Sequence, residues 1–337
     1  MKDTYLLQGL HRLLGHEQTD AQCVELAGGA SDRRYFRVST ADKSWVVMVL
    51  PGDALKSEEI SSGPTPEDLP FVLVQSFLKN ADVPVPTIHL YDRELGQLWL
   101  DDLGDTTMLD QLNSKNQMDL YKEAIDLLIQ FQQAMAVTPE AFIATQRCFE
   151  PSLLTWELEH YVEWRVQEQL QNTPSPADAA LLPELFSHIV NELQAQPQVV
   201  CHRDFQSTNL MCTDNALILI DFQDALLGPY AYDLVALLRD SYVVLEPQQV
   251  DTLIGYYLDE RKDLNPEQFR RAFDFQTVQR KLKDAGRFVF IDRVKNDDRY
   301  LKWVDSTLLY VRHALARRPG LSAMHDCLKR LDPEAFE

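Results

Sequence analysis

Strand-like and helix-like segments do not alternate along this chain but are separated. The β-rich runs fall near the N-terminus, at about 23–27, 33–39, 44–50, 88–91 and 97–101, and helical patterns dominate afterwards. A doubly wound sheet needs a helix after nearly every strand, so this order argues against it. The order predicts an α+β protein of two lobes, with a small β-rich N-lobe (1–103) and a large, mainly helical C-lobe (104–337).

Glycine, proline and other turn-forming residues mark where the expected elements of the N-lobe begin and end. Leucines at helical spacing before Gly15 predict a short N-terminal amphipathic helix. The first three β-rich runs, separated by GGASD and TADKS, predict an antiparallel meander. The composition of 51–65 is typical of a mobile loop, and 67–83 is expected to be helical before VPVP at 83–86 ends it.

The C-lobe is expected to consist of helices around one β-rich island. The predicted helices cover 107–136, 151–171, 177–195, 231–245, 247–261, 266–294 and 299–316. The island, at 199–225, has two short strand-like pieces around a polar loop. It is the one place in this lobe where a polar loop is held on a rigid apolar platform.

Composition narrows the classes of partner. The chain has 52 acidic and 32 basic residues in 337, a formal net charge of −20, which argues against binding a phosphate backbone. Its five cysteines are scattered without a CxxC pair, so neither a disulfide framework nor a structural zinc site is expected. Its apolar runs are far shorter than the roughly 20 residues of a membrane helix. We expect a cytoplasmic protein with no membrane and no nucleic-acid partner; the sequence leaves its oligomeric state open.

The β-rich island contains a set of hard oxygen ligands. His202, Asp204 and Asn209 lie in HRDFQSTN, and Asp221 follows the apolar strand LILI. Carboxylate and amide oxygens without a cluster of His or Cys favour Mg²⁺ over Zn²⁺. Magnesium held by one or two carboxylates leaves coordination sites for substrate phosphates, which points to phosphoryl transfer.

The pattern HxDxxxxN with a later aspartate resembles the aminoglycoside-phosphotransferase and choline-kinase-like family, supported by GPYAYDLVALLRD at 228–240. The resemblance implies a bilobal protein-kinase-like fold, with ATP and Mg²⁺ as cofactors. Within this family the segments HRDFQSTNLM, RRYFRV and WLDDLGD are most similar to bacterial kinases that phosphorylate the anomeric hydroxyl of N-acetylmuramate and N-acetylglucosamine in cell-wall recycling. The resemblance thus implies a small-molecule sugar acceptor.

Two alternatives stay open from the sequence. One is a kinase of an aminoglycoside, choline or another amino alcohol, and the acidic net charge suits a cationic acceptor. The other is a non-catalytic, pseudokinase-like nucleotide-binding module, because the third strand carries Met48 where many relatives carry a phosphate-binding lysine. Carboxylates lining the acceptor pocket would favour aminoglycosides. Amides, aromatics and an arginine for a lactyl carboxylate would favour muramic sugars.

The resemblance assigns roles to matching positions. Asp204 takes the place of the catalytic aspartate, which accepts or orients the proton of the attacking hydroxyl and contributes roughly 10²–10⁴ in rate. Asn209 and Asp221 take the places of the residues that hold the metal ions. His202 is an accessory residue expected to brace the loop. Arg203, also accessory, replaces the glycine usual in antibiotic kinases and is either a loop anchor or a phosphate contact.

Residues next to these positions are candidates for the acceptor site. Gln206 and Gln223 can contact the sugar, a metal-bound water or other loop groups. Asp224 is a candidate for metal assistance or substrate binding. Asp233 begins an apolar helix and is interpreted as its N-cap. Glu157 lies on an aromatic and polar helical stripe, which either lines the acceptor pocket, as the corresponding insert does in the family, or packs in the core.

The nucleotide is expected to bind along the N-lobe. The first turn, with Gly28, Gly29 and Ser31, can present backbone N–H groups to phosphates. Arg33 or Arg34 is expected to replace the charge of the missing lysine. At the junction of the lobes, backbone groups around Trp99, Leu100 and Asp101 are expected to contact the base, with a solvated hinge as the alternative for Asp101 and Asp102.

Overall fold

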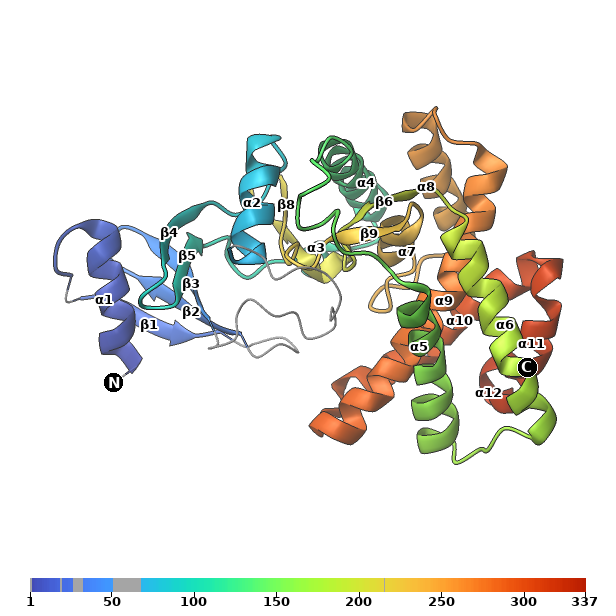
Figure 1. The fold of residues 1–337 in the computed structure, drawn as a ribbon. Coiled ribbons are helices and arrows are strands. Elements are labelled where there is room, and N and C mark those ends of the chain that lie inside the picture. Colours follow the sequence, from blue (N-terminus) through green and yellow to red (C-terminus); the bar gives the residue numbers. More distant parts are fainter. Residues whose placement is uncertain (1, 19, 27–32, 51–67, 215) are drawn as a thin grey trace.

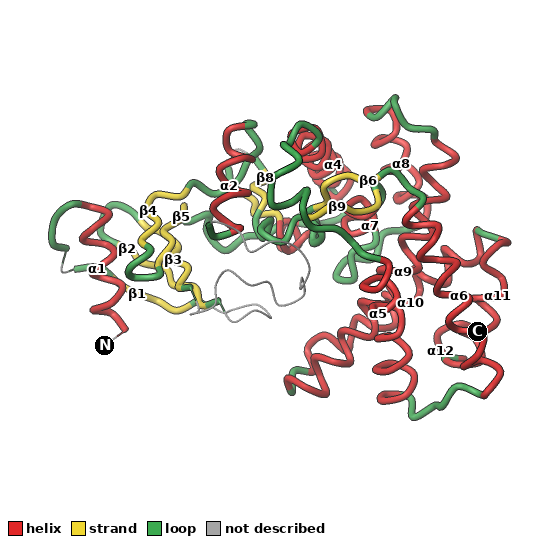
Figure 2. The backbone as a smooth tube through the Cα atoms, in the orientation of Figure 1, coloured by secondary structure: helices red, strands yellow, loops and turns green. Residues whose placement is uncertain are grey.

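The computed structural model describes five stretches of the chain, residues 2–18, 20–26, 33–50, 68–214 and 216–337. Figure 1 shows a β-rich N-lobe beside a larger helical C-lobe, and Figure 2 shows that strands also occur where the C-lobe meets the N-lobe. The predicted α+β organisation is confirmed.

The N-lobe is a five-stranded antiparallel sheet in the order β1-β2-β3-β5-β4. Its strands are β1 (Gln22–Glu25), β2 (Arg34–Ser39), β3 (Ser44–Val49), β4 (Ile88–Asp92) and β5 (Gln97–Asp101). The first three form the predicted meander. The helix α1 (Lys2–Leu14) precedes them and ends at Gly15, whose φ of 74° is one that glycine adopts without a steric penalty.

The two faces of this sheet pack against different partners. On one face, Leu10 of α1 packs with Trp45 and Trp99. On the other face, Met48 and Leu98 belong to a second hydrophobic core, which continues through α2 (Pro70–Asn80) into the C-lobe. The lobes therefore share buried apolar surface in addition to the chain that connects them.

The C-lobe is built of helices, most of them close to the predicted segments. They are α3 (Met108–Gln111), α4 (Gln117–Met135), α5 (Pro151–His160), α6 (Pro176–Gln194), α7 (Tyr232–Leu238), α8 (Pro247–Glu260), α9 (Pro266–Lys295), α10 (Val304–Arg317), α11 (Ser322–Leu331) and α12 (Pro333–Phe336). Short 3₁₀ segments lie at Ser207–Asn209, Asp298–Trp303 and Pro319–Leu321.

Two of the predicted helices are interrupted or ended by local side-chain hydrogen bonds. The segment 107–136 is broken because the Asn113 side chain accepts the backbone N–H of Lys115 (3.0 Å) and so forms a turn between α3 and α4. The segment 231–245 ends early because the Asp240 carboxylate accepts the N–H of Tyr242 (3.0 Å). Such local side-chain bonds compete with the helical pattern and are not visible in hydrophobic periodicity.

The 30-residue helix α9 contacts α5, α6, α7 and α10. The chain continues from α5 as a π-helix, Tyr161–Gln169, and α9 crosses this junction closely. A Cβ atom at Gly286 would lie 2.7 Å from the carbonyl oxygen of His160. Glycine at this position therefore sets how near α9 comes to α5.

The predicted β-rich island forms two antiparallel strand pairs. β6 (Gln198–Cys201) pairs with β9 (Leu226–Pro229), and β7 (Leu210–Cys212) pairs with β8 (Leu217–Leu219). The connections between the pairs, 202–209 and 220–225, are consequently neighbours. The N–H of Ile220 donates to the carbonyl oxygen of Asn209 at 3.1 Å.

Two further predictions can be compared with the structure. All five cysteines are free, as their spacing predicted. Within the described stretches, none of the helices combines the length and apolar character required for a membrane crossing.

Candidate active site

The candidate catalytic loop, residues 202–209, is held by hydrogen bonds to the segment that contains α7. The carboxylate of Asp233 accepts the backbone N–H groups of His202 (2.7 Å) and Arg203 (3.0 Å). The carboxylate of Asp240 accepts the N–H of Ser207 (2.9 Å) and also its hydroxyl. The prediction that Asp233 caps its helix is wrong, because its carboxylate bonds to the loop instead. Both buried carboxylates fix the loop backbone.

Two residues of the site have left-handed backbone conformations. The φ angle is 80° at Arg203 and 64° at Asp221. Residues with a Cβ atom pay about 1–2 kcal/mol for this conformation, so the bonds from Asp233 must hold the loop against it. The Arg203 side chain is buried over the ring of Phe149, with 5.5 Å from Cζ to the ring centroid. Of its two predicted roles, burial favours the loop anchor over a phosphate contact.

His202 braces the loop, as its accessory role requires. Its side chain is fully buried and packs edge-on against the rings of Phe131 and Phe205. Its Nε2 lies 3.0 Å from the carbonyl oxygen of Ile220, so it joins the two connections of the island. Burial lowers the pKa of His202 and keeps the imidazole neutral. The geometry suits a structural residue.

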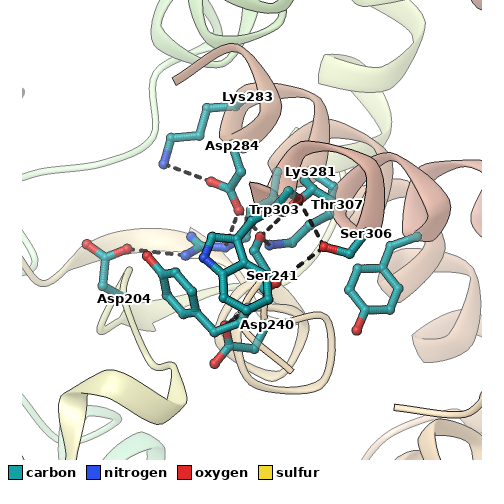
Figure 3. Close-up of polar contacts among 12 residues, drawn as sticks. Asp204, Asp240, Ser241, Lys281, Lys283, Asp284, Trp303, Ser306 and Thr307 are labelled. Carbon is teal, nitrogen blue, oxygen red and sulfur yellow. Dashed lines mark hydrogen bonds and ion pairs between the residues drawn. The ribbon is translucent and has the colours of Figure 1, made fainter. Parts of the chain in front are cut away.

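Asp204, labelled in Figure 3, is the half-exposed carboxylate at the centre of the site. Arg280 of α9 holds it in place. Arg280 Nη2 donates to Asp204 Oδ1 at 3.2 Å, and Nη1 donates to the carbonyl oxygen of Arg203 at 2.7 Å. Burial raises the pKa of Asp204, but the charges of Arg280 and Lys283 outweigh this and lower it overall. Asp204 is therefore an oriented, ionised carboxylate open to solvent on one side.

The metal ligands predicted from the sequence lie across the loop. Asn209 Nδ2 donates to the carbonyl oxygen of Asp204 (2.9 Å), which leaves its Oδ1 available as a ligand. Asp221 accepts Gln223 Nε2 on Oδ1 (2.7 Å), and the same nitrogen lies 3.5 Å from Asp224 Oδ2. Burial and the nearby charges of Asp204 and Asp224 raise the pKa of Asp221.

This donor set fits a hard divalent cation. The Asp221 carboxylate and the free Oδ1 of Asn209 are hard oxygen donors, and a cation beside Asp221 would offset the charge repulsion from Asp204 and Asp224. Among the described residues, no group of three or more His, Cys, Asp or Glu side chains is placed so that it could hold a metal ion, so a cation here would rely on Asp221, Asn209 and ligands from outside the protein. A site of this type would leave coordination positions for substrate oxygens. Gln223 is 4% exposed and its amide donates to Asp221, which favours hydrogen bonding within the loops among the roles expected for it.

The predicted phosphate-binding turn is described only at its end. Gly28, Gly29 and Ser31 lie outside the described residues. The charge of Arg33 counteracts the rise in the pKa of Asp221, so Arg33 lies within electrostatic reach of the metal side. Arg34 instead pairs with Glu25 on β1 at 2.6 Å. The two arginines, equivalent in the sequence, thus have different surroundings.

The third strand has no cation at the lysine position. Met48 is fully buried and pairs in register with Tyr35 on one side and Leu98 on the other. It belongs to the shared core of the lobes and contributes packing rather than charge. A compensating cation must come from another segment, and Arg33 is the described candidate.

The predicted base contacts need correction. Trp99 is fully buried, and its backbone lies in the sheet between Val47 of β3 and Leu90 of β4. Leu100 is likewise paired in the sheet and buried. Asp101 is the last residue of β5, and its carboxylate accepts the N–H of Thr87 (2.8 Å). Backbone free to contact a base follows β5, beyond Asp101.

The segment after β5 is tied to the N-lobe by one arginine. Arg37 of β2 binds both oxygens of Asp102 (2.8 and 3.0 Å) and both oxygens of Asp105 (2.8 and 3.0 Å). Bidentate pairs of this kind add directional specificity to their energy. Asp102 is thus an ion-paired hinge residue rather than a free solvated one.

The two remaining candidates for the acceptor site, Gln206 and Glu157, lie in different surroundings. Gln206 is half-buried in the turn directly after Asp204, and its N–H donates to the carbonyl oxygen of Asp204 at 2.9 Å. Glu157 is 2% exposed and accepts Gln279 Nε2 of α9 at 2.6 Å. We correct the prediction of a substrate contact for Glu157, because its buried carboxylate bonds to Gln279 and so packs α5 against α9.

The contribution of α9 and of the 3₁₀ segment Asp298–Trp303 to the site was not predicted from the sequence. Lys281 and Lys283 flank the carboxylate of Asp284, at 2.5 Å and 3.7 Å from it, and the charges of both lysines lower its pKa despite burial (Figure 3). The rings of Tyr242 and Trp303 meet edge to face with centroids 5.7 Å apart. Burial and the charges of nearby acids, Asp284 and Asp204 among them, raise the pKa of Tyr242.

Lys283 stands out within this group. Its side chain is 17% exposed, its charge acts on Asp204, and no hydrogen bond to another described residue engages its ammonium group. A run of polar residues within a long helix was the available signal for these positions, but periodicity does not say which of them face a site.

A β-rich lobe joined to a helical lobe, with the Asp204 carboxylate oriented by Arg280 and with oxygen donors on the adjoining loops, is the organisation of a kinase-like phosphotransferase. The model of the phosphotransferase enzyme family known as APH matches residues 22–271. The chain belongs to this family and is a phosphotransferase.

Curated relatives extend the match beyond the family. The N-acetylmuramate/N-acetylglucosamine kinases of Pseudomonas putida and Pseudomonas aeruginosa are each 34% identical to this chain. The first alignment covers 91% of this chain and 87% of the relative, and the second covers 95% and 91%. The enzyme of the same name from Neisseria meningitidis is 32% identical over 94% and 92%.

Solved structures share the fold at low sequence identity. A choline/ethanolamine kinase family protein from Mesorhizobium loti has a TM-score of 0.61 at 14% identity, over 98% of this chain and 99% of its own. A spectinomycin phosphotransferase in complex with ADP and spectinomycin has a TM-score of 0.56 at 15% identity, over 91% and 93%. These similarities confirm the predicted bilobal kinase-like fold.

Proposed function

We propose that this phosphotransferase moves the γ-phosphoryl group of ATP to the anomeric hydroxyl of N-acetylmuramate or N-acetylglucosamine, in the recycling of cell-wall sugars. The observation that carries the proposal is the similarity, at 34% identity over nearly the whole chain, to kinases named for these two sugars. The clamped Asp204 and the adjoining oxygen ligands agree with it. We also propose a cytoplasmic location, where ATP is available and cysteines stay free.

In the proposed step Asp204 positions the acceptor. The sugar hydroxyl oxygen attacks the γ-phosphorus, a new O–P bond forms, and the bond from the γ-phosphorus to the oxygen of ADP breaks. The hydroxyl proton passes to the Asp204 carboxylate, which Arg280 keeps ionised and oriented. Positioning of this kind carries much of the catalysis in phosphoryl transfer.

We propose that Asn209 Oδ1 and the Asp221 carboxylate hold Mg²⁺, with Gln223 orienting Asp221 and with Asp224 beside it. When bound, Mg²⁺ supplies positive charge that neutralises the ATP phosphates. Arg33 adds charge from the N-lobe side, where the family's lysine is replaced by Met48.

The acceptor side suits a sugar that carries an acid better than a cationic acceptor. Arg280 and Lys283 present positive charge beside Asp204, and Tyr242 and Trp303 supply aromatic surface. Aromatic rings suit the apolar faces of sugar rings. The ammonium group of Lys283 would repel an aminoglycoside or choline and attract the lactyl carboxylate of N-acetylmuramate.

The test is an incubation of the full chain with ATP and Mg²⁺ and, in turn, N-acetylmuramate, N-acetylglucosamine, kanamycin and choline. Phosphorus NMR then locates any new phosphate. An anomeric phosphate on either amino sugar is the expected result. Turnover confined to kanamycin or choline would overturn the proposal, and Asp204→Asn is the matched inactive control.

A further inference from the structure

A second polar pocket lies away from the catalytic loop, among α8, the first third of α9 and the end of α10. Its volume is about 430 Å³, within the range of about 300–1,000 Å³ typical of small-molecule sites. Its lining includes Asp251 of α8, Arg270 and Asp274 of α9, Arg317 at the end of α10 and the adjoining Arg318. The active site uses a different part of α9, so the two sites are separate.

The ion pairs in this pocket do not neutralise all of its arginines, so the lining keeps a net positive charge. Arg317 and Arg270 share one carboxylate oxygen of Asp251, at 3.3 and 3.7 Å. Arg318 forms an ion pair with the buried carboxylate of Asp274, with 2.6 Å between Arg318 Nε and Asp274 Oδ2. Three arginines therefore face two aspartates. Arg270 and Arg317 remain one-third exposed, with side-chain values of 38% and 32%, so they are open to a ligand.

A fourth arginine lies directly behind the pocket wall. Arg239 is fully buried, and its guanidinium lies over the ring of Phe273, which lines the pocket, and over that of Tyr310. Its three side-chain nitrogens have no hydrogen-bond partner in the described part of the chain. Burial first, and then the nearby charge of Arg317, lower its pKa to about 10. A buried guanidinium without such partners is costly, so this charge needs an explanation.

The positive character of this region extends to its neighbours. His313 of α10 has a pKa lowered by burial and by the charges of Arg239, Arg312 and Arg317. Counting Arg239, the pocket region has four arginines and two aspartates, a surplus of two positive charges, within a chain of net charge −20. A local reversal of sign of this kind marks a binding site for an anion.

We propose that this pocket binds the phosphate monoester of a small metabolite. A phosphate monoester carries about 1.5–2 negative charges at pH 7, which matches the surplus, and its oxygens suit the arginine fork. The concave shape admits a small molecule. The acidic surface of the rest of the chain would repel a polyanion such as RNA. The site is independent of the acceptor proposed for the active site.

The test measures binding of glucose 6-phosphate by calorimetry to the full chain, with Mg²⁺ and a non-hydrolysable ATP analogue present to occupy the nucleotide site. Glucose is the neutral control, and glucuronate, with one negative charge, is the carboxylate control. We expect glucose 6-phosphate to bind, glucuronate to bind roughly tenfold more weakly, and glucose not to bind at this site.

Variants assign the binding to this pocket. Arg270→Gln and Arg317→Gln should each weaken glucose 6-phosphate binding about tenfold or more, because each removes a charge from the lining. Arg271→Gln is the matched control: Arg271 is on the same helix, 47% exposed, and pairs with Glu192 outside the pocket. Arg318 is not substituted, because its loss would leave the buried carboxylate of Asp274 without its ion-pair partner. Thermal melting checks that each variant is folded.

The outcomes separate cleanly. Binding lost in both pocket variants and kept in Arg271→Gln supports the site. No binding up to about 10 mM, equal binding of glucose and glucose 6-phosphate, or equal affinity in all folded variants overturns it. Tighter binding of glucuronate than of glucose 6-phosphate would also contradict the assignment to phosphate monoesters.

Discussion

Replacement of Arg280 by methionine tests the central geometry of the site. Arg280 is 2% exposed on its side chain and makes two bonds to the loop, one to Asp204 Oδ1 (3.2 Å) and one to the carbonyl oxygen of Arg203 (2.7 Å). A hydrogen bond to a charged group is worth about 1.5–3 kcal/mol. If that energy positions Asp204 in the transition state, kcat falls roughly 10- to 150-fold.

The same change has a pH signature and a cost in stability. Arg280 is the strongest of the charges that keep the pKa of Asp204 below its ordinary value. Without it this pKa rises, so a larger fraction of Asp204 is protonated on the acid side and the acid limb of kcat/KM moves to higher pH. Breaking a buried pair costs about 3–5 kcal/mol, and the half exposure of Asp204 places this case at the low end.

Steady-state kinetics from acid to neutral pH and urea unfolding measure these effects. Arg280→Lys keeps the charge but loses the fork, so it should recover the pH profile more than kcat. Arg271→Met, an exposed change on the same helix, is the control and should leave both near the wild-type values. A folded Arg280→Met protein with kcat within about threefold of wild type and an unmoved acid limb would refute the reasoning.

Three further predictions follow from the described contacts. Arg33→Ala should raise the KM for ATP roughly tenfold, and Arg34→Ala, whose side chain is paired on β1, should not; equal effects in kinetics with varied ATP would contradict this. Lys283→Met should raise the KM for N-acetylmuramate roughly tenfold or more and change the KM for N-acetylglucosamine less than about threefold. Equal changes in the two KM values would contradict a contact between Lys283 and the lactyl carboxylate. The hydrogen bond from Arg330 lowers the pKa of Asp178 in the folded protein. The pair therefore stabilises the fold at pH values above the pKa of Asp178 in the unfolded chain, and this stabilisation is lost as the pH falls through the folded-state pKa. Asp178→Asn should lower the melting temperature at pH 7 but not near about pH 2.

Local patterns predicted the elements well where packing and local preference agree. The helix expected at 266–294 is Pro266–Lys295, and the strand expected at 97–101 is Gln97–Asp101. The catalytic loop was predictable because its residues are close in sequence. The residue order HxDxxxxN brings Asp204 and Asn209 into one turn, and a short strand returns the chain to Asp221.

Tertiary partners were not predictable from the same patterns. Arg280 is 76 residues from Asp204, and nothing in the period of α9 shows that it reaches the loop. Glu157 has the residue type of a ligand but is buried behind α9. Asp233 has the position of a helix cap, yet its carboxylate finds backbone donors in another segment. In each case a contact distant in the sequence decides between alternatives that local sequence leaves equal.

The two carboxylates that fix the catalytic loop, Asp233 and Asp240, belong to one short segment around α7. In evolutionary terms, loop and segment form a unit that must be inherited together, since a change in either exposes unsatisfied backbone donors of the other. Lys283 and Trp303, which we propose to face the acceptor, lie outside this unit. Under the proposed function, substitutions at these later positions would change acceptor binding without disturbing the hydrogen bonds that hold the loop.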